Sequence, residues 1–136
     1  MGFVELTRRE TFSASHRLQS ASLNDTENRQ LYGKCNNLYG HGHNYVWEVT
    51  LRGSIDPKSG MVYNLADLEN EMKSVIDEVD HKNLDKEIDY FKNNVSTTEN
   101  LIVYLWNKLK SSLANPELLY KMVLHETEKN SMTYYG

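Results

Sequence analysis

Cysteine, proline and long apolar runs are scarce in this sequence of 136 residues, which has one cysteine and two prolines. A single cysteine excludes an internal disulfide framework and any zinc site built from four thiolates. No window approaches the roughly 18 apolar residues of a membrane-spanning helix, and residues 1–20 lack the apolar core of a secretory signal. We therefore expect a cytoplasmic protein with a reduced thiol and no membrane partner.

An excess of basic charge is also missing, because 19 acidic residues outweigh 15 basic ones and give a net charge of −4. This balance argues against a general nucleic-acid binder, although it allows a local basic patch for a small anion. The apolar share of 39% and the charged share of 25% are ordinary for a soluble globule and exclude a disordered chain, collagen or a coiled coil. The length predicts a single domain over residues 1–136.

Hydrophobic periodicity divides the chain into strands and helices. Alternation of polar and apolar residues predicts strands at 3–18, 44–53, 61–63, 120–127 and 131–135. Apolar residues at helical spacing predict one helix over about 65–79 and a second helix from Leu101 to Leu113. Asn64 is the expected cap of the first helix, and residues 96–99 (STTE) have the form of a capping box for the second.

The connections at 19–40 and 80–95 are predicted to be loops. The order strand-strand, helix-helix, strand-strand predicts an α+β fold in which both helices cover one face of an antiparallel sheet. The other face of the sheet is then either solvated or buried in an oligomer. Trp47, together with several tyrosines, favours the oligomer.

The first candidates for chemistry are His41 and His43, which are separated by Gly42. Histidines two positions apart on an extended segment point to the same face, and the glycine between them allows close backbone approach. The pair is a candidate zinc chelate, and His16, set among small residues, is a candidate third ligand. Ordinary surface or core histidines are the alternative. Three histidines without a fourth protein ligand would leave a coordination position open, as in catalytic zinc sites.

Cys35 lies six residues before His41 and admits three interpretations. It is an inert buried thiol, which is the commonest state of a lone cysteine. It is a fourth zinc ligand that closes the site. Or it is a base or nucleophile near the metal, with its thiolate favoured by Lys34 and by the cation. Sequence spacing does not separate the second interpretation from the third.

Several further polar residues are candidates for catalysis or binding. His81 directly follows Asp80 and has a reference pKa of about 6.5, which suits proton transfer; the alternative is a plain loop histidine. Glu126 continues an apolar strand face, so it lies either at an exposed strand end or in a pocket, where it could grip a guanidine-like edge. Thr97 and Thr98 are explained by helix capping, although backbone groups there could face a ligand.

Six motifs in this order resemble the 6-pyruvoyl tetrahydropterin synthase family over almost the full chain. They are FSASHRL at 12–18, GKCNNLYGHGHNY at 33–45, GMVYNLADL at 60–68, DHKNLD at 80–85, STTEN at 96–100 and HET at 125–127. The resemblance implies the T-fold (tunnelling fold), with paired helices on an antiparallel sheet and sheets joined across subunits into a trimeric barrel. Two trimers would stack into a homohexamer with active sites between subunits.

The resemblance also implies that His16, His41 and His43 bind one Zn²⁺ per subunit and that Cys35 is the catalytic proton acceptor. An open zinc can act as a Lewis acid toward the hydroxyl and carbonyl oxygens of a substrate side chain. A thiolate is a suitable base for removing the proton from the adjacent carbon. A requirement for Mg²⁺ is left open.

The remaining matched residues would serve the relay and the pterin. Asp80 and His81 would relay the proton of the cysteine. Glu126 would anchor the pterin ring and also take part in the relay, and Thr97 and Thr98 would line the pterin pocket. A carboxylate accepts two parallel N–H groups, which suits the edge of a pterin ring.

The implied reaction converts 7,8-dihydroneopterin triphosphate to 6-pyruvoyl-tetrahydropterin and triphosphate in tetrahydrobiopterin biosynthesis. This carbon–oxygen lyase reaction with internal redox agrees with the lack of a dinucleotide-binding fingerprint. Lys34 and Arg17 are candidate triphosphate contacts, with plain surface charge as the alternative.

Two alternative functions are a 6-carboxy-tetrahydropterin synthase of deazapurine biosynthesis and a non-catalytic zinc- or pterin-binding scaffold. Five residues separate Cys35 from His41, as in the pyruvoyl synthases, whereas the carboxy synthases have three. The scaffold is disfavoured by the presence of Cys35 and His81, because a pure binder needs neither residue.

Overall fold

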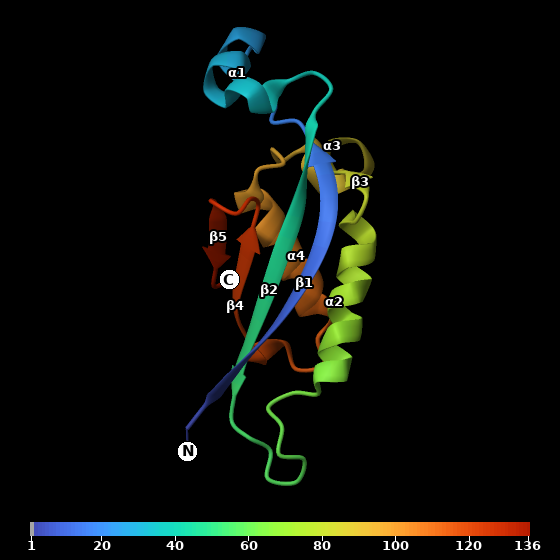
Figure 1. Ribbon diagram of the computed structural model, residues 1–136, viewed down its shortest axis with the longest axis vertical. Coiled ribbons are helices and arrows are strands. Elements are labelled where there is room, and N and C mark those ends of the chain that lie inside the picture. Colours follow the sequence, from blue (N-terminus) through green and yellow to red (C-terminus); the bar gives the residue numbers. More distant parts are fainter. Residues whose placement is uncertain (1) are drawn as a thin grey trace.

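The computed structural model describes residues 2–136, which form a five-stranded sheet with two long helices over one face (Figure 1). The strands are β1 (Val4–His16), β2 (His41–Gly53), β3 (Lys82–Asn83), β4 (Leu119–His125) and β5 (Ser131–Tyr134). The α-helices are α1 (Asp25–Tyr32), α2 (Leu65–Val79), α3 (Leu84–Glu87) and α4 (Thr98–Ser112), and the 3-10 turns are η1 (Gly33–Asn36), η2 (Asp89–Lys92) and η3 (Pro116–Leu118). The order across the sheet is β3-β1-β2-β4-β5, and only the β1–β3 pair is parallel. The predicted α+β class is confirmed.

Strands β1 and β2 form a long antiparallel ribbon whose upper end carries the candidate site. Pairing runs from Val4 opposite Gly53 to His16 opposite His41. Strand β2 therefore begins three residues before the predicted 44–53. The sequence His-Gly-His has no apolar alternation, and it is a strand because β1 continues to pair with it. The ribbon thus brings residues from two distant segments into register.

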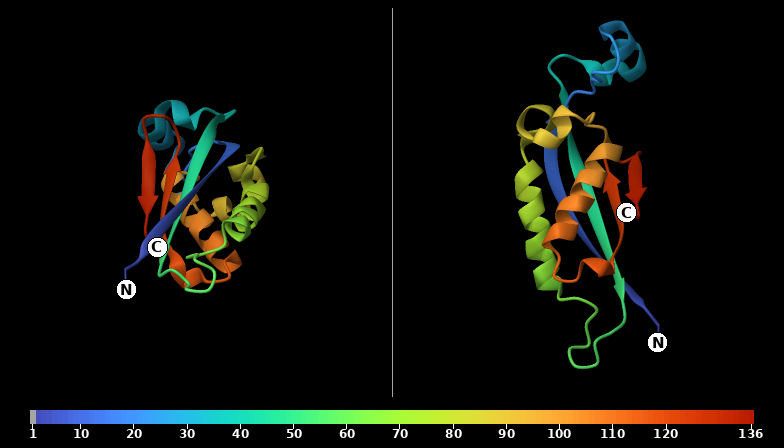
Figure 2. Two further views of the ribbon diagram at one scale, coloured as in Figure 1. Left: turned by 60° about the horizontal axis from the view of Figure 1, so that its bottom comes forward. Right: turned by 180° about the vertical axis from the view of Figure 1, so that it is seen from behind.

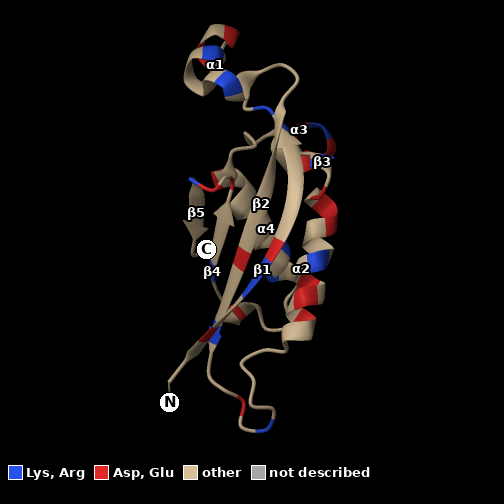
Figure 3. Cartoon of the chain, viewed as in Figure 1, with Lys and Arg blue, Asp and Glu red and all other residues tan. Residues whose placement is uncertain are grey.

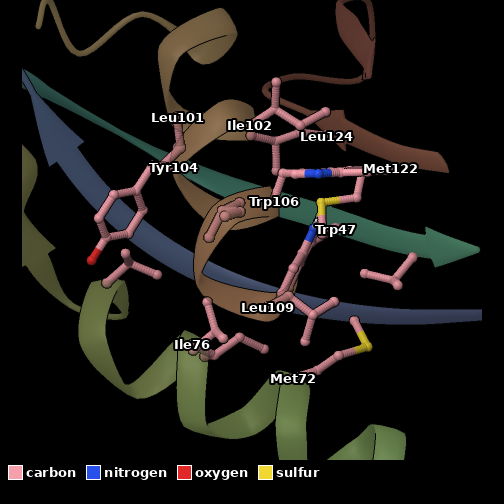
Figure 4. Close-up of a cluster of buried hydrophobic side chains, with 14 of the residues drawn as sticks. Trp47, Met72, Ile76, Leu101, Ile102, Tyr104, Trp106, Leu109, Met122 and Leu124 are labelled. Atoms are coloured by element: carbon pink, nitrogen blue, oxygen red, sulfur yellow. Dashed lines mark hydrogen bonds between the residues drawn. The ribbon is translucent and has the colours of Figure 1, made fainter. Parts of the chain in front are cut away.

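The core lies between the sheet and the layer formed by α2 and α4 (Figure 4). Alternate residues of β2, which include Tyr45, Trp47 and Val49, are fully buried in it. The indole N–H of Trp47 points at Met122 Sδ, 3.4 Å away. The expectation that Trp47 marks an intermolecular surface is therefore wrong, because strand parity turns its side chain toward the helices.

The opposite face of the sheet is largely polar. On it, the hydroxyls of Thr7 and Thr50 lie 2.8 Å apart. The His125 ring of β4 forms a hydrogen bond with the Glu48 carboxylate of the neighbouring strand β2. Charged residues are concentrated along α2, and the upper parts of β1 and β2 carry none (Figure 3). The end of the ribbon that holds the histidines is therefore polar without carrying charged side chains of its own.

Both long helices have an N-terminal cap formed by a polar side chain. Helix α2 spans the predicted residues 65–79, and the side-chain oxygen Oδ1 of Asn64 accepts hydrogen bonds from the N–H groups of its first turn, as expected. Helix α4 begins after Thr97, whose Oγ1 accepts from the N–H of Asn100 at 3.2 Å. The capping box predicted over 96–99 is therefore wrong by one residue, because the third helical position is Asn100 and not a glutamate.

The segment 19–40 is not the predicted plain loop. It contains α1 and η1 and projects beyond the end of the sheet (Figures 1 and 2). Helix α1 starts at a reciprocal cap in which Asn24 and Glu27 each accept the other's backbone N–H. Asn28 is its one buried residue, so the sequence has no apolar stripe that would predict this helix.

Two further connections differ from the sequence predictions. Residues 61–63 do not form a returning strand, because Tyr63 turns inward and donates a 2.8 Å hydrogen bond to Glu71 of α2. The segment 80–95 is not a plain loop, since it contains β3, α3 and η2. Strand β3 pairs in parallel with residues 14–15 of β1. The first departure arises from a side-chain contact with α2 and the second from strand pairing between distant segments, and hydrophobic periodicity encodes neither.

Candidate metal centre and its surroundings

His16, His41 and His43 converge at the upper end of the β1–β2 ribbon. His16 ends β1, and the other two begin β2 on the same face. One ligating atom of each residue lies within 4.8 Å of the others, and His16 Nε2 lies 3.1 Å from His41 Nε2. Gly40, at a φ of +75°, allows the turn into β2 to pass close to His16, because a Cβ there would lie 2.9 Å from the His16 carbonyl oxygen.

A backbone contact orients the His16 ring, and burial favours the unprotonated form of His16 and His43. His16 is 1% exposed, and its Nδ1 lies 2.6 Å from the Ser96 carbonyl oxygen, which leaves Nε2 free to face the other rings. Burial lowers the pKa of His16 and of His43, because desolvation disfavours the protonated ring. Neutral imidazoles fixed by a backbone acceptor are the usual zinc donors. The three residues therefore fit a metal ion.

A carboxylate stands beside the histidines. Glu126 directly follows β4, and its Oε2 lies 3.9 Å from His43 Nε2. Thr98, in the first turn of α4, donates a 2.5 Å hydrogen bond to the same oxygen. Glu126 is neither fully exposed nor fully buried, with 23% side-chain exposure. Glu126 therefore lies just past the strand end, partly buried, bonded to Thr98 and close to His43.

Cys35 lies on η1, outside the histidine cluster. Its thiol is free and partly exposed, and within residues 2–136 the potential ligand group comprises the histidines alone. Its carbonyl oxygen accepts a 2.8 Å hydrogen bond from Leu18 N–H, two residues beyond His16. Lys34, beside it, is exposed. The chain thus ties the backbone of Cys35 to the strand end that carries His16, without adding the thiol to the cluster.

Asp80 and His81 form a dyad on the loop after α2. Asp80 Oδ2 lies 3.0 Å from His81 Nδ1, and Asp80 Oδ1 accepts from Ser13 N–H at 2.9 Å. That backbone hydrogen bond lowers the pKa of Asp80. His81 has a left-handed φ of 60° and donates its own N–H to Ser13 O at 2.6 Å. This rare backbone conformation brings two adjacent side chains together, although neighbours usually diverge.

The dyad and the histidine cluster are separate in the single chain. The His81 side chain is 82% exposed, and its anchor Ser13 has the opposite strand parity to His16. The structure therefore gathers His16, His41 and His43 with the Glu126–Thr98 pair, and leaves Cys35 and the dyad on other segments. Thr97 serves as the cap of α4.

Two groups that contact the histidines, the Ser96 carbonyl and the Tyr45 ring, could not be recognised from the sequence. The Ser96 carbonyl, which orients His16, is a backbone acceptor that any residue would supply. Tyr45 packs edge-on against His43 at 5.6 Å between ring centroids. Its hydroxyl is the one buried side-chain polar atom of residues 2–136 without a hydrogen-bond partner. Burial raises the pKa of Tyr45, so its phenol is neutral. Its position on the apolar parity of β2 suggested only packing.

Three converging imidazoles and an adjacent carboxylate on an α+β subunit form a group that could hold a metal ion through three protein ligands, one fewer than structural zinc sites have. The sequence comparisons give the family. The chain belongs to the 6-pyruvoyl tetrahydropterin synthase family, whose model matches residues 5–136. The family resemblance read from the motifs is confirmed, and the chain is thereby assigned to a family of enzymes.

Individual relatives match over nearly the whole chain. A 6-pyruvoyl tetrahydrobiopterin synthase of Drosophila melanogaster is 55% identical over 132 residues, which cover 96% of this chain and 79% of the relative. The Homo sapiens protein of the same name is 51% identical over 134 residues, which cover 98% of this chain and 92% of the relative.

Solved structures agree with this assignment. A Caenorhabditis elegans 6-pyruvoyl tetrahydropterin synthase superposes with a TM-score of 0.98 at 56% identity, over 100% of this chain and 97% of that one. A Plasmodium vivax structure with a TM-score of 0.71 and 19% identity, over 100% and 99% of the two chains, supports the fold alone. Within residues 2–136, no helix has the length and apolarity to span a membrane.

Proposed function

We propose that this chain is a 6-pyruvoyl tetrahydropterin synthase, which converts 7,8-dihydroneopterin triphosphate to 6-pyruvoyl-tetrahydropterin and triphosphate in tetrahydrobiopterin biosynthesis. The proposal is carried by the convergence of His16, His41 and His43 beside Glu126 in a chain that matches this family from residue 5 to residue 136. The whole chain would act as one pterin-binding domain. The reaction is a carbon–oxygen lyase reaction, because the triphosphate leaves with the electrons of its carbon–oxygen bond.

One Zn²⁺ per subunit is the proposed metal, held by the three histidines. Nitrogen donors, a coordination position left for substrate and a fixed His16 tautomer all suit zinc. When bound, the metal supplies Lewis acidity toward the substrate's side-chain oxygens. Added Mg²⁺ is a second possible requirement, which assays with and without Mg²⁺ would decide.

The proposed role of Glu126 is to orient the substrate. Its carboxylate can accept two parallel N–H bonds from the amino-pyrimidine edge of the pterin. The 2.5 Å bond from Thr98 fixes one carboxylate oxygen, and Thr97 and Thr98 would line the ring. Because Glu126 lies 3.9 Å from a metal ligand, a pterin held there extends its side chain toward the histidines. A further contribution of Glu126 to the proton relay is part of the same proposal.

Proton transfer is assigned to Cys35, Asp80 and His81. The Cys35 thiolate would take a proton from a side-chain carbon, and the electron pair left behind would move into the rearranging pterin, which needs no external reductant. Asp80 holds Nδ1 of His81, so the opposite ring nitrogen is available to exchange that proton. The 82% exposure of His81 supports a dyad that acts on the site of a neighbouring copy.

The proposed assembly is a homohexamer of two stacked trimers in the cytoplasm. Within each trimer, the sheets would join edge to edge into a barrel. Strand β5 is bonded only on its β4 side, and the outer side of β1 is covered only near its end, by β3 at residues 14–15 and by Asp80 and His81 at Ser13, so both sheet edges offer free backbone groups. The polar face opposite the helices would then line the barrel interior.

The decisive test is incubation of the purified protein with 7,8-dihydroneopterin triphosphate, with and without a zinc chelator. We expect inorganic triphosphate and a pyruvoyl pterin, both abolished by the chelator and restored by Zn²⁺. Acetaldehyde and a carboxy pterin would instead identify a 6-carboxy-tetrahydropterin synthase, which the relatives do not favour. Pterin binding without turnover would identify a scaffold.

A further inference from the structure

Cys35 lies in segment 19–40, outside the sheet and the two long helices, so its position relative to the histidines is not fixed by the core. Segment 19–40 projects beyond the upper end of the sheet (Figures 1 and 2). The histidines, in contrast, lie on the rigid β1–β2 ribbon. A base that must meet a substrate held at the histidines needs a fixed position relative to them, and a loop base has that only if other residues hold it.

Four hydrogen bonds join the Cys35–Asn36 pair to residues 17–19. Leu18 N–H donates to the Cys35 carbonyl at 2.8 Å. The Asn36 amide donates to Leu18 O at 2.7 Å and to Gln19 Oε1 at 2.6 Å. Arg17 Nε donates to the Asn36 carbonyl at 2.9 Å. Asn36 is 5% exposed, so water does not easily replace its bonds. We call these four bonds the Cys35 clamp.

The clamp is itself attached to the metal centre. Arg17 directly follows His16, and its backbone N–H donates to Asp85 at 2.6 Å. Ser96, whose carbonyl holds His16 Nδ1, also directs its hydroxyl toward the Arg17 carbonyl, at 3.5 Å. The strand end at residues 16–17 is thus fixed to α3 and to the start of α4. Cys35 is positioned from the same backbone that positions a metal ligand.

The structure also changes the interpretation of Arg17. Its Nε is committed to the Asn36 carbonyl, so the guanidinium is not a plain surface charge. A planar guanidinium can hold a backbone carbonyl in a fixed direction, whereas a lysine ammonium is a point charge on a flexible stem. We propose that Arg17 and Asn36 are positioning residues that fix the backbone of Cys35 relative to the strand end that carries His16; this rests on the proposed role of Cys35 as the base.

The test compares Asn36→Ala with Asn28→Ala, which alters another buried asparagine of segment 19–40. Asn28 bonds the backbone of residues 20, 23 and 24 and makes no bond of the clamp. For Asn36→Ala we expect kcat to fall about 10- to 100-fold, with KM within about threefold and full zinc content, because misplacement by about 1 Å costs this much. For Asn28→Ala we expect kcat near that of the wild type.

A second readout is independent of catalysis. Cys35 is the sole cysteine, so the rate of reaction with a thiol-specific disulfide reagent reports on this residue alone. We expect modification at least about tenfold faster in Asn36→Ala than in the wild type, since this variant loses both hydrogen bonds of the Asn36 amide and even one lost buried bond loosens a segment by about that factor. If Cys35 proves not to be the base, this rate still tests the clamp. Wild-type kcat and wild-type thiol reactivity in Asn36→Ala would overturn the proposal.

Arg17→Lys separates the clamp from a triphosphate contact, because it keeps the charge and removes the Nε bond. The clamp predicts a loss of kcat with unchanged KM, and a smaller added effect in the double variant with Asn36→Ala than in the wild-type background. Wild-type kcat in Arg17→Lys would overturn the role of Arg17. If Asn36→Ala does not fold, Asn36→Asp removes the same donors with almost no change in volume, and the same outcomes apply.

Discussion

At the scale of single residues, Glu126, the proposed pterin anchor, is oriented by a single contact. The residue lies just past the end of β4, where a carboxylate would ordinarily be mobile and solvated. Thr98 Oγ1 reaches it from α4 and bonds one oxygen at 2.5 Å, so the direction of the carboxylate is set before any ligand arrives. Preorganisation of this kind lowers the entropic cost of binding.

Glu126→Gln should weaken pterin binding about 10- to 100-fold, because charge-assisted hydrogen bonds contribute about 1.5–3 kcal/mol. The zinc content should stay at the wild-type level, since no ligand of the proposed site is altered. Fluorescence titration with neopterin and metal analysis of the purified variant would measure the two quantities. Glu128→Gln, at an exposed position two residues along the chain, is the matched control. Equal pterin affinity of Glu126→Gln and the wild type would contradict the anchor role.

At the scale of secondary-structure elements, what could be predicted depended on how each element is stabilised. Helix α2 matched its predicted bounds, because an amphipathic stripe and the Asn64 cap are both local signals. Helix α1 was missed, because it buries Asn28 alone and depends on polar caps. Strand β3 consists of two residues and exists through its pairing with β1, which no local pattern reveals.

The same distinction holds for the candidate site. Convergence of His41 and His43 followed from strand parity, and the β1–β2 register brought His16 to them. The contact between Asp80 and His81 could not be predicted, because it needs a left-handed backbone at a residue that is not glycine. The orienting carbonyl of Ser96 has no side-chain signature at all. Trp47 was misplaced because an aromatic residue on a strand suits either face.

Tyr63 fixes the connection between β2 and α2, and its removal should affect stability but not catalysis. The hydroxyl donates to Glu71 at 2.8 Å and accepts from the N–H of Ala114 at 3.0 Å, and burial together with Glu71 raises the pKa of Tyr63 to about 12. Tyr63→Phe should therefore destabilise the fold by about 1–2 kcal/mol. Urea unfolding at one fixed protein concentration would measure this, with Tyr135→Phe as an exposed control. A loss of kcat in Tyr63→Phe would contradict the purely structural role.

At the scale of the whole molecule, the groups proposed for catalysis lie on separate parts of one chain. Cys35 is tied to residues 17–19, beside His16. The dyad is tied to Ser13, and His81 points outward with 82% exposure. A ring of copies would resolve this separation, because each chain would present its dyad to the cluster of the next chain. Heterologous contacts of this kind close into rings when the rotation allows it.

Mixed oligomers test this arrangement directly. Cys35→Ala and His81→Ala should each be inactive alone, and Cys35→Ala should still bind zinc, because the histidine cluster is complete without the thiol. When the two variants are unfolded together and refolded in equal amounts, random mixing should give about one quarter of the sites an intact Cys35 and an intact neighbouring His81. Activity should therefore recover to about a quarter of the wild-type level.

The matched control for this recovery is a mixture of Asp80→Asn with His81→Ala. Asp80 and His81 are adjacent and bonded within one chain, so no combination of these two variants restores an intact dyad. That mixture should stay inactive even though its chains exchange equally well, which affinity tags on the two variants would verify. If the Cys35→Ala and His81→Ala mixture also stays inactive after proven exchange, the two residues serve the same chain. Asp80 and His81 would then have to reach Cys35 through a rearrangement of the loop that Ser13 now holds.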